Sequence, residues 1–230
     1  MTSEVLDQDL EPADATSAGS GRALRITLVA VLVAALAVLA GTAGWLIGDR
    51  GSSSASVSSS SVDAGFARDM STHHQQAVTM AIYERQYTTS ADLHLIAYDI
   101  EDTQVFQIGQ MQGWLDIWGL TRDDSHPMTW MGSAHAGHLE NGLMPGMATP
   151  AQMNRLESLR GKALDVMFLQ LMIHHHQGGI PMARYALEHA KNAYVQNLAR
   201  QMVSTQSAEI IQMEQALRKL GGTPLPAPPS

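Results

Sequence analysis

The sequence predicts an all-α protein: an antiparallel four-helix bundle of two duplicated helical hairpins, preceded by a single transmembrane helix. Residues 62–119 align with residues 164–221 after a shift of 102 residues, without a gap, and 18 of the 58 aligned positions are identical. Apolar residues in both copies recur at steps of three and four residues, the period of an amphipathic helix. A run of 22 uncharged residues, 26–47, is long enough to cross a bilayer.

The first sixty residues predict three segments. Residues 1–25 form an acidic tail, residues 26–48 a transmembrane anchor and residues 49–61 a Ser-rich linker. Because Arg22 and Arg25 precede the apolar run, the positive-inside rule places the N-terminus in the cytoplasm and the C-terminal domain outside it. The expected location is therefore the cell membrane, with a single pass. A cleaved signal peptide is the alternative, although its apolar region is usually shorter than this one.

The predicted helices lie in the duplicated region, residues 62–222. Ser90 and Asn192 occupy equivalent positions and suit the N-cap of the second helix in each hairpin. Gly119 and Gly221 are also equivalent and suit the C-terminal ends of these helices. The two copies of the hairpin therefore give four helices, which pack as a bundle.

A connecting segment, residues 121–149, joins the two hairpins. Its last residue, Thr149, begins a capping box with proline at the first helical position, which predicts a short helix near residues 150–160. After the fourth helix the chain ends in a Pro-rich tail, residues 223–230.

The composition excludes several classes of function. The chain has no cysteine, so disulfides, thiolate catalysis and cysteine-held zinc or iron–sulfur centres are excluded. The formal net charge of −8, without any basic run, argues against a nucleic-acid partner. The chain is rich instead in His and Met, with 10 and 14 residues, which makes imidazole and thioether groups the candidate ligands.

Candidate metal ligands recur in the first helix of each hairpin. In each copy one Met precedes a His-His pair by three residues and a second Met follows the pair, spacings that bring the side chains to nearly one helical face. If pseudo-twofold symmetry brings these two helices together, as many as eight residues converge near the bundle axis: Met70, His73, His74, Met80, Met172, His175, His176 and Met182. Imidazole and thioether without thiolate favour copper, especially Cu(I).

Simpler interpretations of these residues remain. Methionine at helical spacing is more often core filler than ligand. A single buried histidine is usually a hydrogen-bonded core residue. Gln104 and Gln206 are expected on the core face, where they would hydrogen-bond the second ring nitrogen of a ligating histidine.

The connecting segment is a second candidate site. Its candidate ligands are Met128, Met131, His135, His138, Met144 and Met147. Methionines in a Gly-rich loop with little core to fill favour Cu(I), whereas His135 and His138 would equally hold Cu(II) or Zn(II). Zinc is the less expected metal for the protein as a whole. The alternative is a loop whose methionines pack against the bundle.

Together these motifs resemble the domain of unknown function 305 family over about residues 62–222. The motifs are Met70-x-x-His73-His74, Ala77-x-x-Met80-Ala81, Met144-Pro145-Gly146-Met147, Phe168-Leu169-x-x-Met172-x-x-His175-His176 and Gly179-x-x-Met182-Ala183. The resemblance implies a ferritin-like bundle in a secreted or membrane-anchored protein associated with copper binding and tolerance. The transmembrane anchor and Pro181 depart from the family pattern.

The leading hypothesis is a membrane-anchored extracytoplasmic protein, not an enzyme, that sequesters or transfers copper through His and Met ligands. Its expected partners are copper ions, the membrane through residues 26–47, and a copper exporter or respiratory complex. The first alternative is an accessory or structural subunit of a membrane complex, without metal. The second is a metal-dependent redox enzyme on a ferritin-like bundle, although the sequence lacks the Glu-x-x-His pairs of di-metal centres.

Overall fold

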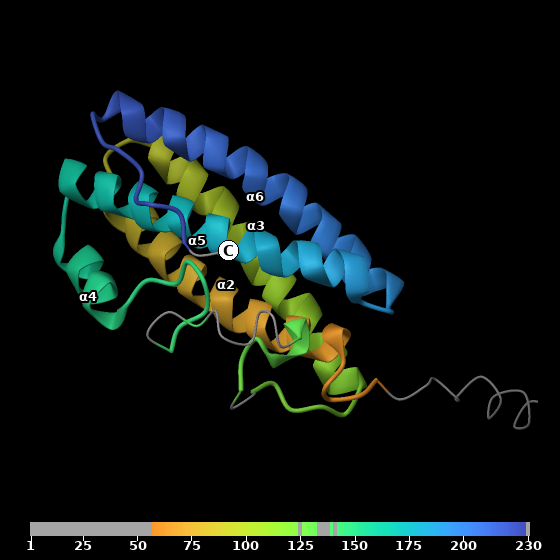
Figure 1. The fold of residues 1–230 in the computed structure, drawn as a ribbon. Coiled ribbons are helices and arrows are strands. Elements are labelled where there is room, and N and C mark those ends of the chain that lie inside the picture. Colours follow the sequence, from red (N-terminus) through yellow and green to blue (C-terminus); the bar gives the residue numbers. More distant parts are fainter. Residues whose placement is uncertain (1–56, 124–125, 133–138, 140–141, 229–230) are drawn as a thin grey trace, which may run out of the picture. The chain divides into compact units, whose positions relative to one another are not determined.

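The computed structural model describes residues 57–123, 126–132, 139 and 142–228. This part of the chain is all-helical, as predicted, and contains no β-strand (Figure 1). Its elements are α2 (Val62–Tyr87), α3 (Ala91–Ile117), the short 3₁₀ helix η1 (Thr129–Met131), α4 (Pro150–Ser158), α5 (Lys162–His189) and α6 (Ala193–Lys219). The four long helices, α2, α3, α5 and α6, are those expected from the duplication.

The predicted helix ends are confirmed. The side chains of Ser90 and Asn192 accept hydrogen bonds from the backbone at the starts of α3 and α6. Thr149 begins α4 with the reciprocal hydrogen bonds of a capping box. Gly119 and Gly221 follow α3 and α6 with φ of 67° and 75°, the left-handed conformation that glycine adopts without a steric penalty.

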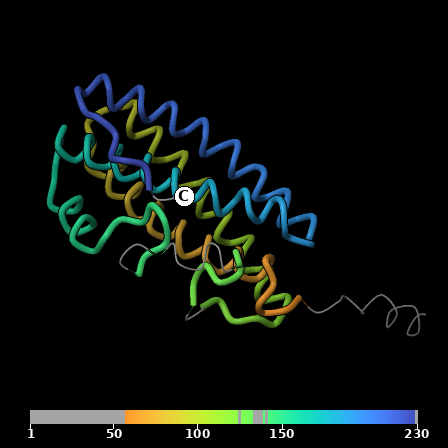
Figure 2. The backbone as a smooth tube through the Cα atoms, in the orientation of Figure 1, coloured from red at the N-terminus to blue at the C-terminus, as the bar shows by residue number. Residues whose placement is uncertain are grey.

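The helices form two antiparallel hairpins, α2–α3 and α5–α6, which pack on each other mainly through α2 and α5. The path of the chain through the two hairpins is clearest in the backbone tube (Figure 2). Asp63 at the start of α2 ties the hairpins together, because its carboxylate accepts hydrogen bonds from the backbone N–H groups of Lys191 and Asn192, just before α6. An anionic group is favoured at a helix N-terminus.

A polar layer crosses the middle of the bundle and divides its core into two apolar clusters. The first contains Phe66 of α2 and Met111 of α3, together with the end of α5 and the start of α6. The second contains Ile100 of α3 and Phe168 of α5, together with the end of α6. The histidine pairs of α2 and α5 lie between these two halves of the helices.

The segments flanking the bundle also contact it. Ser59, in the predicted linker, accepts hydrogen bonds from the Arg68 guanidinium through its backbone and side-chain oxygens, at 2.7 and 2.8 Å. The tail after α6 runs back along α5, since Gln170 donates to the Thr223 carbonyl at 2.7 Å and His174 to the Pro226 carbonyl at 2.9 Å. The end of the linker and the start of the tail therefore pack on the bundle as part of the folded unit.

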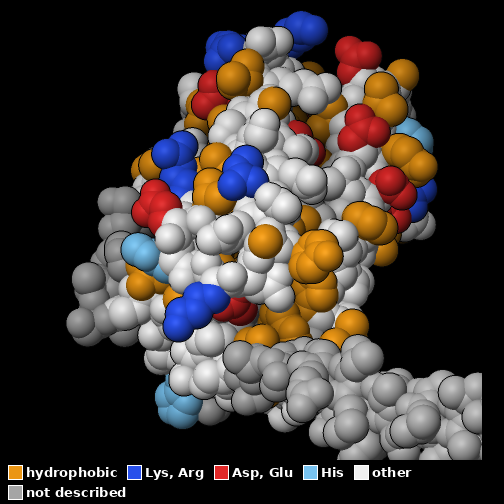
Figure 3. All heavy atoms as spheres, turned by 90° about the vertical axis from the view of Figure 1, so that its right-hand side faces the viewer, with side chains coloured by type: hydrophobic (Ala, Val, Ile, Leu, Met, Phe, Trp, Pro, Cys, Tyr) orange, Lys and Arg blue, Asp and Glu red, His pale blue; other side chains and the backbone are white. Residues whose placement is uncertain are grey.

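The predicted transmembrane segment, residues 26–48, lies outside the described residues, as does the acidic tail. Among the helices that the structure describes, none is both long and apolar enough to cross a membrane. On the face shown in Figure 3, Lys and Arg side chains are scattered among acidic and hydrophobic ones rather than gathered in one basic patch.

Candidate metal centre

Four histidines occupy the middle of the bundle. His73 and His74 of α2 and His175 and His176 of α5 are at most 1% exposed. The rings of His73 and His175, at equivalent positions in the two copies, lie with their centroids 3.8 Å apart and their planes inclined by 39°. The duplication thus brings two His-His pairs together at the contact between the hairpins.

Three of these rings are fixed through Nε2. His74 donates to the Gln107 side-chain oxygen at 2.8 Å, and His176 to the Glu209 carboxylate at 2.7 Å. The two partners, on α3 and α6, are again separated by 102 residues. His73 donates to the backbone carbonyl of Pro145 in the connecting segment, at 3.0 Å. Because these oxygens only accept hydrogen bonds, each Nε2 carries a proton, and in the neutral form of such a ring Nδ1 is bare.

The remaining ring nitrogens have no hydrogen-bond partner. The buried, unpartnered atoms are Nδ1 of His73, His74, His175 and His176, and Nε2 of His175. A buried acceptor without a partner is costly, whereas a bare imidazole nitrogen whose ring is fixed through the other nitrogen is the arrangement of a metal-ligating histidine. The orphaned nitrogens therefore fit a bound cation.

Burial keeps the imidazoles of His73, His74 and His175 uncharged. Desolvation lowers the pKa of His73 to about 4, against a weaker opposing effect of its hydrogen bond to Pro145. Desolvation, and then the neighbouring His73, lowers the pKa of His74 to about 3. The same two causes depress the pKa of His175. At neutral pH these rings need to lose no proton before they bind a metal.

The expected roles of Gln104 and Gln206 are wrong in detail. Both are buried in the polar layer, and Gln206 lies close to His73 opposite Gly179, but neither hydrogen-bonds a histidine ring. The partners are instead Gln107 and Glu209, one helical turn further on. Gln107 and Glu209 are separated by 102 residues and so occupy equivalent positions in the two copies. The sequence comparison did not single them out, because one is an amide and the other an acid.

The four helix methionines expected near the bundle axis are all buried, but they lie in two different halves of the core. Met70 and Met182 belong to the first apolar cluster, whereas Met80 and Met172 belong to the second, on the other side of the polar layer. The first cluster is by far the richer in thioethers. Its buried methionines are Met70, Met111, Met128, Met131, Met144, Met182 and Met202, and the half-buried Met147 packs against them.

The methionines of the connecting segment are held in this cluster by polar anchors. Asp69 of α2 accepts hydrogen bonds from the Met128 backbone at 2.6 Å and from the Trp130 indole at 2.7 Å. Met128 has a φ of 68°, a strained value for a residue other than glycine. Trp130 packs directly on Gly65, where a Cβ would collide with the indole.

The second part of the connecting segment crosses the polar layer. The Gln76 side chain accepts a hydrogen bond from the Ala148 N–H at 2.6 Å and donates to its carbonyl at 2.9 Å. A Cβ on Gly178 of α5 would collide with the backbone of Pro145, so glycine permits this close approach. A hollow of about 280 Å³ beside this crossing is lined by Met144 and Met147.

His135 and His138 lie outside the described residues. Within the part of the chain that the structure describes, no three His, Asp or Glu side chains form a ready-made metal site. The described candidate donors are thus bare imidazole nitrogens in the polar layer and thioethers on either side of it.

Two duplicated hairpins that enclose a layer of buried histidines define the class of protein. The chain belongs to the family called Domain of unknown function (DUF305), whose model matches residues 63–217. The predicted family is therefore confirmed. Among curated proteins, no significant match to the chain is found.

Solved structures of the same family have similar folds. A putative secreted DUF305 protein from Streptomyces coelicolor is 45% identical, with a TM-score of 0.68 over 73% of this chain and 99% of that one. A DUF305 fragment from Deinococcus radiodurans is 32% identical, with a TM-score of 0.57 over 69% and 96%. CopM in its Cu(II)-bound form is 28% identical, with a TM-score of 0.53 over 69% and 97%. CopM is also solved in a Cu(I)-bound form, at 25% identity.

Proposed function

We propose that this protein binds copper outside the cytoplasm and sequesters it or passes it on. One observation carries the proposal: four buried imidazoles meet at the hairpin contact, each with an unpartnered Nδ1. Neutral imidazole is a good copper ligand. The copper-bound forms of CopM, a structural neighbour, support the choice of metal.

The proposed ligands divide by chemistry. His73, His74, His175 and His176 supply imidazole nitrogens in the polar layer. Thioethers, which are soft ligands, favour Cu(I). The methionines proposed to take part are Met70, Met80, Met172 and Met182 of the helices and Met128, Met131, Met144 and Met147 of the connecting segment. Cu(II) would depend more on the imidazoles, including those of His135 and His138, and zinc is the weaker candidate.

The proposal concerns binding and transfer, without a catalytic step. Residues 26–48 would anchor the chain in the membrane with the N-terminus in the cytoplasm, as the arginines before that run suggest. A copper exporter or a respiratory complex is the proposed protein partner, because the anchor would hold the metal centre close to the membrane.

The test is a titration of the full-length protein with Cu(I) against a competing chelator, repeated with Cu(II) and Zn(II). We expect His73→Gln combined with His175→Gln to weaken copper binding at least tenfold. The exposed His94 and His189 provide a matched control, since changing both to Gln removes two imidazoles outside the polar layer. Equal affinity of the two double variants would refute the histidine layer as the site.

A second arm covers the possibility that histidine variants fail to fold. Met→Leu changes at Met144 and Met147 keep apolar volume and remove only sulfur. A selective loss of Cu(I) affinity in this variant, with Cu(II) binding retained, is the expected result for thioether ligands.

A second candidate function, an accessory subunit of a membrane complex, is favoured by the outer face of α3. Five large hydrophobic residues of this helix are at least half exposed: Leu95, Tyr98, Val105, Phe106 and Ile117. The charged residues of α3 are all acidic, with no Lys or Arg. This face therefore suits a partner segment that combines apolar and basic residues.

A further inference from the structure

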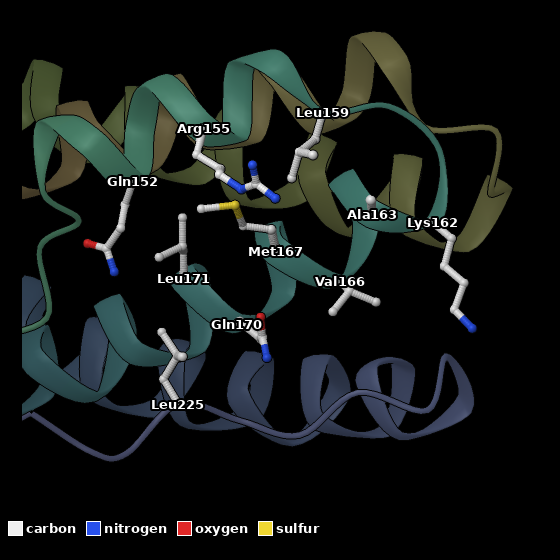
Figure 4. A pocket seen from close by; sticks show the side chains of 10 residues that line it. All are labelled: Gln152, Arg155, Leu159, Lys162, Ala163, Val166, Met167, Gln170, Leu171 and Leu225. Atoms are coloured by element: carbon white, nitrogen blue, oxygen red, sulfur yellow. The ribbon is translucent and has the colours of Figure 1, made fainter.

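A second hollow lies away from the histidine layer, between α4, the first half of α5 and the tail after α6. Its volume is about 630 Å³, within the range of small-molecule sites. Figure 4 shows Arg155 of α4, and Leu159 just after that helix, facing Met167 of α5, with Leu225 of the tail on the opposite side. No residue of the histidine layer lines this hollow.

The walls of the hollow are mostly apolar. Leu159, Val166, Met167, Leu171 and Leu225 contribute aliphatic or thioether side chains. The wall made by the tail is fixed in place by the hydrogen bonds from Gln170 to Thr223 and from His174 to Pro226. The hollow is therefore built by three separate parts of the chain and offers apolar surface that a ligand would remove from water.

The charged residues that line it are both basic. Arg155 and Lys162 are exposed, and neither side chain has a hydrogen bond or an ion pair within the described residues. No Asp or Glu lines the hollow, although acidic residues outnumber basic ones by 22 to 14 in the chain. Two unpaired cations beside an apolar wall complement a ligand with one apolar end and one anionic end.

We propose that this hollow binds a single-chain amphiphile with an anionic head group. The alkyl chain would lie against Leu159, Val166 and Leu171, and the carboxylate or phosphate would pair with Arg155 and Lys162. A free fatty acid and an anionic membrane lipid share this chemistry. The proposal does not depend on copper binding, because the two sites share no residue.

The test uses the full-length protein in nanodiscs of neutral phosphatidylcholine and a dodecanoate probe with a photoreactive diazirine in its chain. After irradiation, mass spectrometry maps the labelled peptides. We expect labelling to concentrate in residues 150–171 and 223–228. The corresponding diazirine alcohol, which lacks the charge, should label these peptides at least tenfold less.

Three variants decide the outcome. Arg155→Gln combined with Lys162→Gln should reduce labelling at least tenfold, because the head group loses both partners. Ala163→Trp keeps both charges but fills the hollow, and should reduce labelling similarly. The control, Arg184→Gln with Lys191→Gln, removes two exposed cations elsewhere and should label like the wild type. A circular dichroism melt of each variant establishes that it is folded.

Unchanged labelling in the first two folded variants, equal labelling by the alcohol, or labelling spread evenly over the chain would overturn the proposal. Nanodiscs that contain phosphatidylglycerol distinguish the two sources of ligand. If they suppress labelling of these peptides, an anionic lipid occupies the hollow. If they leave it unchanged, the site prefers the free fatty acid. Either result supports the anionic amphiphile, provided that the variant results above hold.

Discussion

The rings of His73 and His175 lie 3.8 Å apart at their centroids, although 102 residues separate them in the chain. Two charged imidazolium rings at this distance would repel each other strongly in a buried site. The pair therefore requires neutral rings, and each neutral ring presents an unpartnered Nδ1. Packing of one copy against the other thus brings candidate ligand nitrogens of both hairpins together.

The buried histidines predict a loss of stability in mild acid. In the unfolded chain these rings take up protons below a pKa of about 6.5, whereas in the folded chain His73 stays neutral down to about pH 4 and His74 to about pH 3. The unfolded state then binds more protons, so the free energy of unfolding falls as the pH drops from about 6.5 to 4. His73 alone should account for roughly 3 kcal/mol of this fall in the free energy of unfolding.

Urea unfolding of the metal-free protein at several pH values measures this effect. A His73→Gln, His74→Gln variant should show a flatter acid limb than the wild type. The matched control is His94→Gln on the exposed face of α3, which should keep the wild-type slope. If the His73→Gln, His74→Gln variant lost stability with falling pH as steeply as the His94→Gln control, the prediction would be wrong.

From the environment of Glu84 we predict that its contribution to the free energy of unfolding falls, rather than rises, with increasing pH. Burial, and then repulsion from Asp165, raises its pKa to about 8. Between about pH 4.5 and pH 8 the folded state holds a proton that the unfolded state has lost, so stability falls as the pH rises through this window. The stability of Glu84→Gln relative to the wild type should increase by up to about 1 kcal/mol per pH unit and level off above pH 8.

Taking the difference between variant and wild type cancels the contribution of the histidines. Thermal unfolding at pH 5, 6, 7, 8 and 9 supplies the curve. Glu188→Gln, at an exposed position of α5, is the control and should give a difference that does not change with pH. A flat curve for Glu84→Gln would show that this carboxyl group is ionised in the folded protein at neutral pH.

We predict that Asp69 stabilises the attachment of the connecting segment to the bundle. Its carboxylate accepts hydrogen bonds from the Met128 backbone and the Trp130 indole. Asp69→Ala leaves both buried donors unpartnered, so the free energy of unfolding should fall by about 2 kcal/mol or more. Trypsin should also cleave after Arg122 faster than in the wild type. Asp102→Ala, at an exposed position on α3, should change neither quantity.

Gly178 predicts a steric effect at the crossing of the polar layer. A Cβ at this position would collide with the Pro145 backbone, so Gly178→Ala should displace the connecting segment and destabilise the protein by about 1–3 kcal/mol. It should also weaken copper binding, because Pro145 holds the His73 ring. Gly109→Ala on α3, where a Cβ would meet no atom within 4 Å, should instead stabilise the protein by about 0.5–1 kcal/mol.

The duplication supplies its own test of the apolar face of α3. The α6 residues equivalent to the five exposed hydrophobic residues Leu95, Tyr98, Val105, Phe106 and Ile117 are Asn197, Arg200, Ser207, Ala208 and Lys219. Transferring these residues to α3 should change the free energy of unfolding only slightly, because the originals are exposed. If the protein is an accessory subunit, this variant should lose its partner during purification. Retention of the partner would exclude α3 as the contact.

Local patterns in the sequence were sufficient to predict the four helices and most of their ends. Caps such as Ser90 and Asn192 act within a few residues, so their effect is visible without the fold. The central position of the His-His pairs also followed from the sequence, because two copies of one pattern fall at equivalent heights in antiparallel hairpins.

The partners of the histidines could not be predicted, because they depend on how neighbouring helices are rotated. Gln107 rather than Gln104 meets His74, a difference of one helical turn that no single-helix pattern resolves. The role of Asp69 was hidden for a related reason. Its partners lie about 60 positions away, and its counterpart in the second copy, Leu171, gives no hint of a polar contact.

The connecting segment also bears on how a duplicated protein diverges. Gln76 and Gly178 occupy equivalent positions in the two copies. The Gln76 side chain forms two hydrogen bonds with the Ala148 backbone, whereas Gly178, which has no Cβ, allows the Pro145 backbone to approach closely. His73 bonds the Pro145 carbonyl, while its counterpart His175 has no such partner. Two identical subunits related by a strict twofold axis would have to treat such a segment alike. Two copies within one chain are not under that constraint, so each can differ where it contacts the single connecting segment.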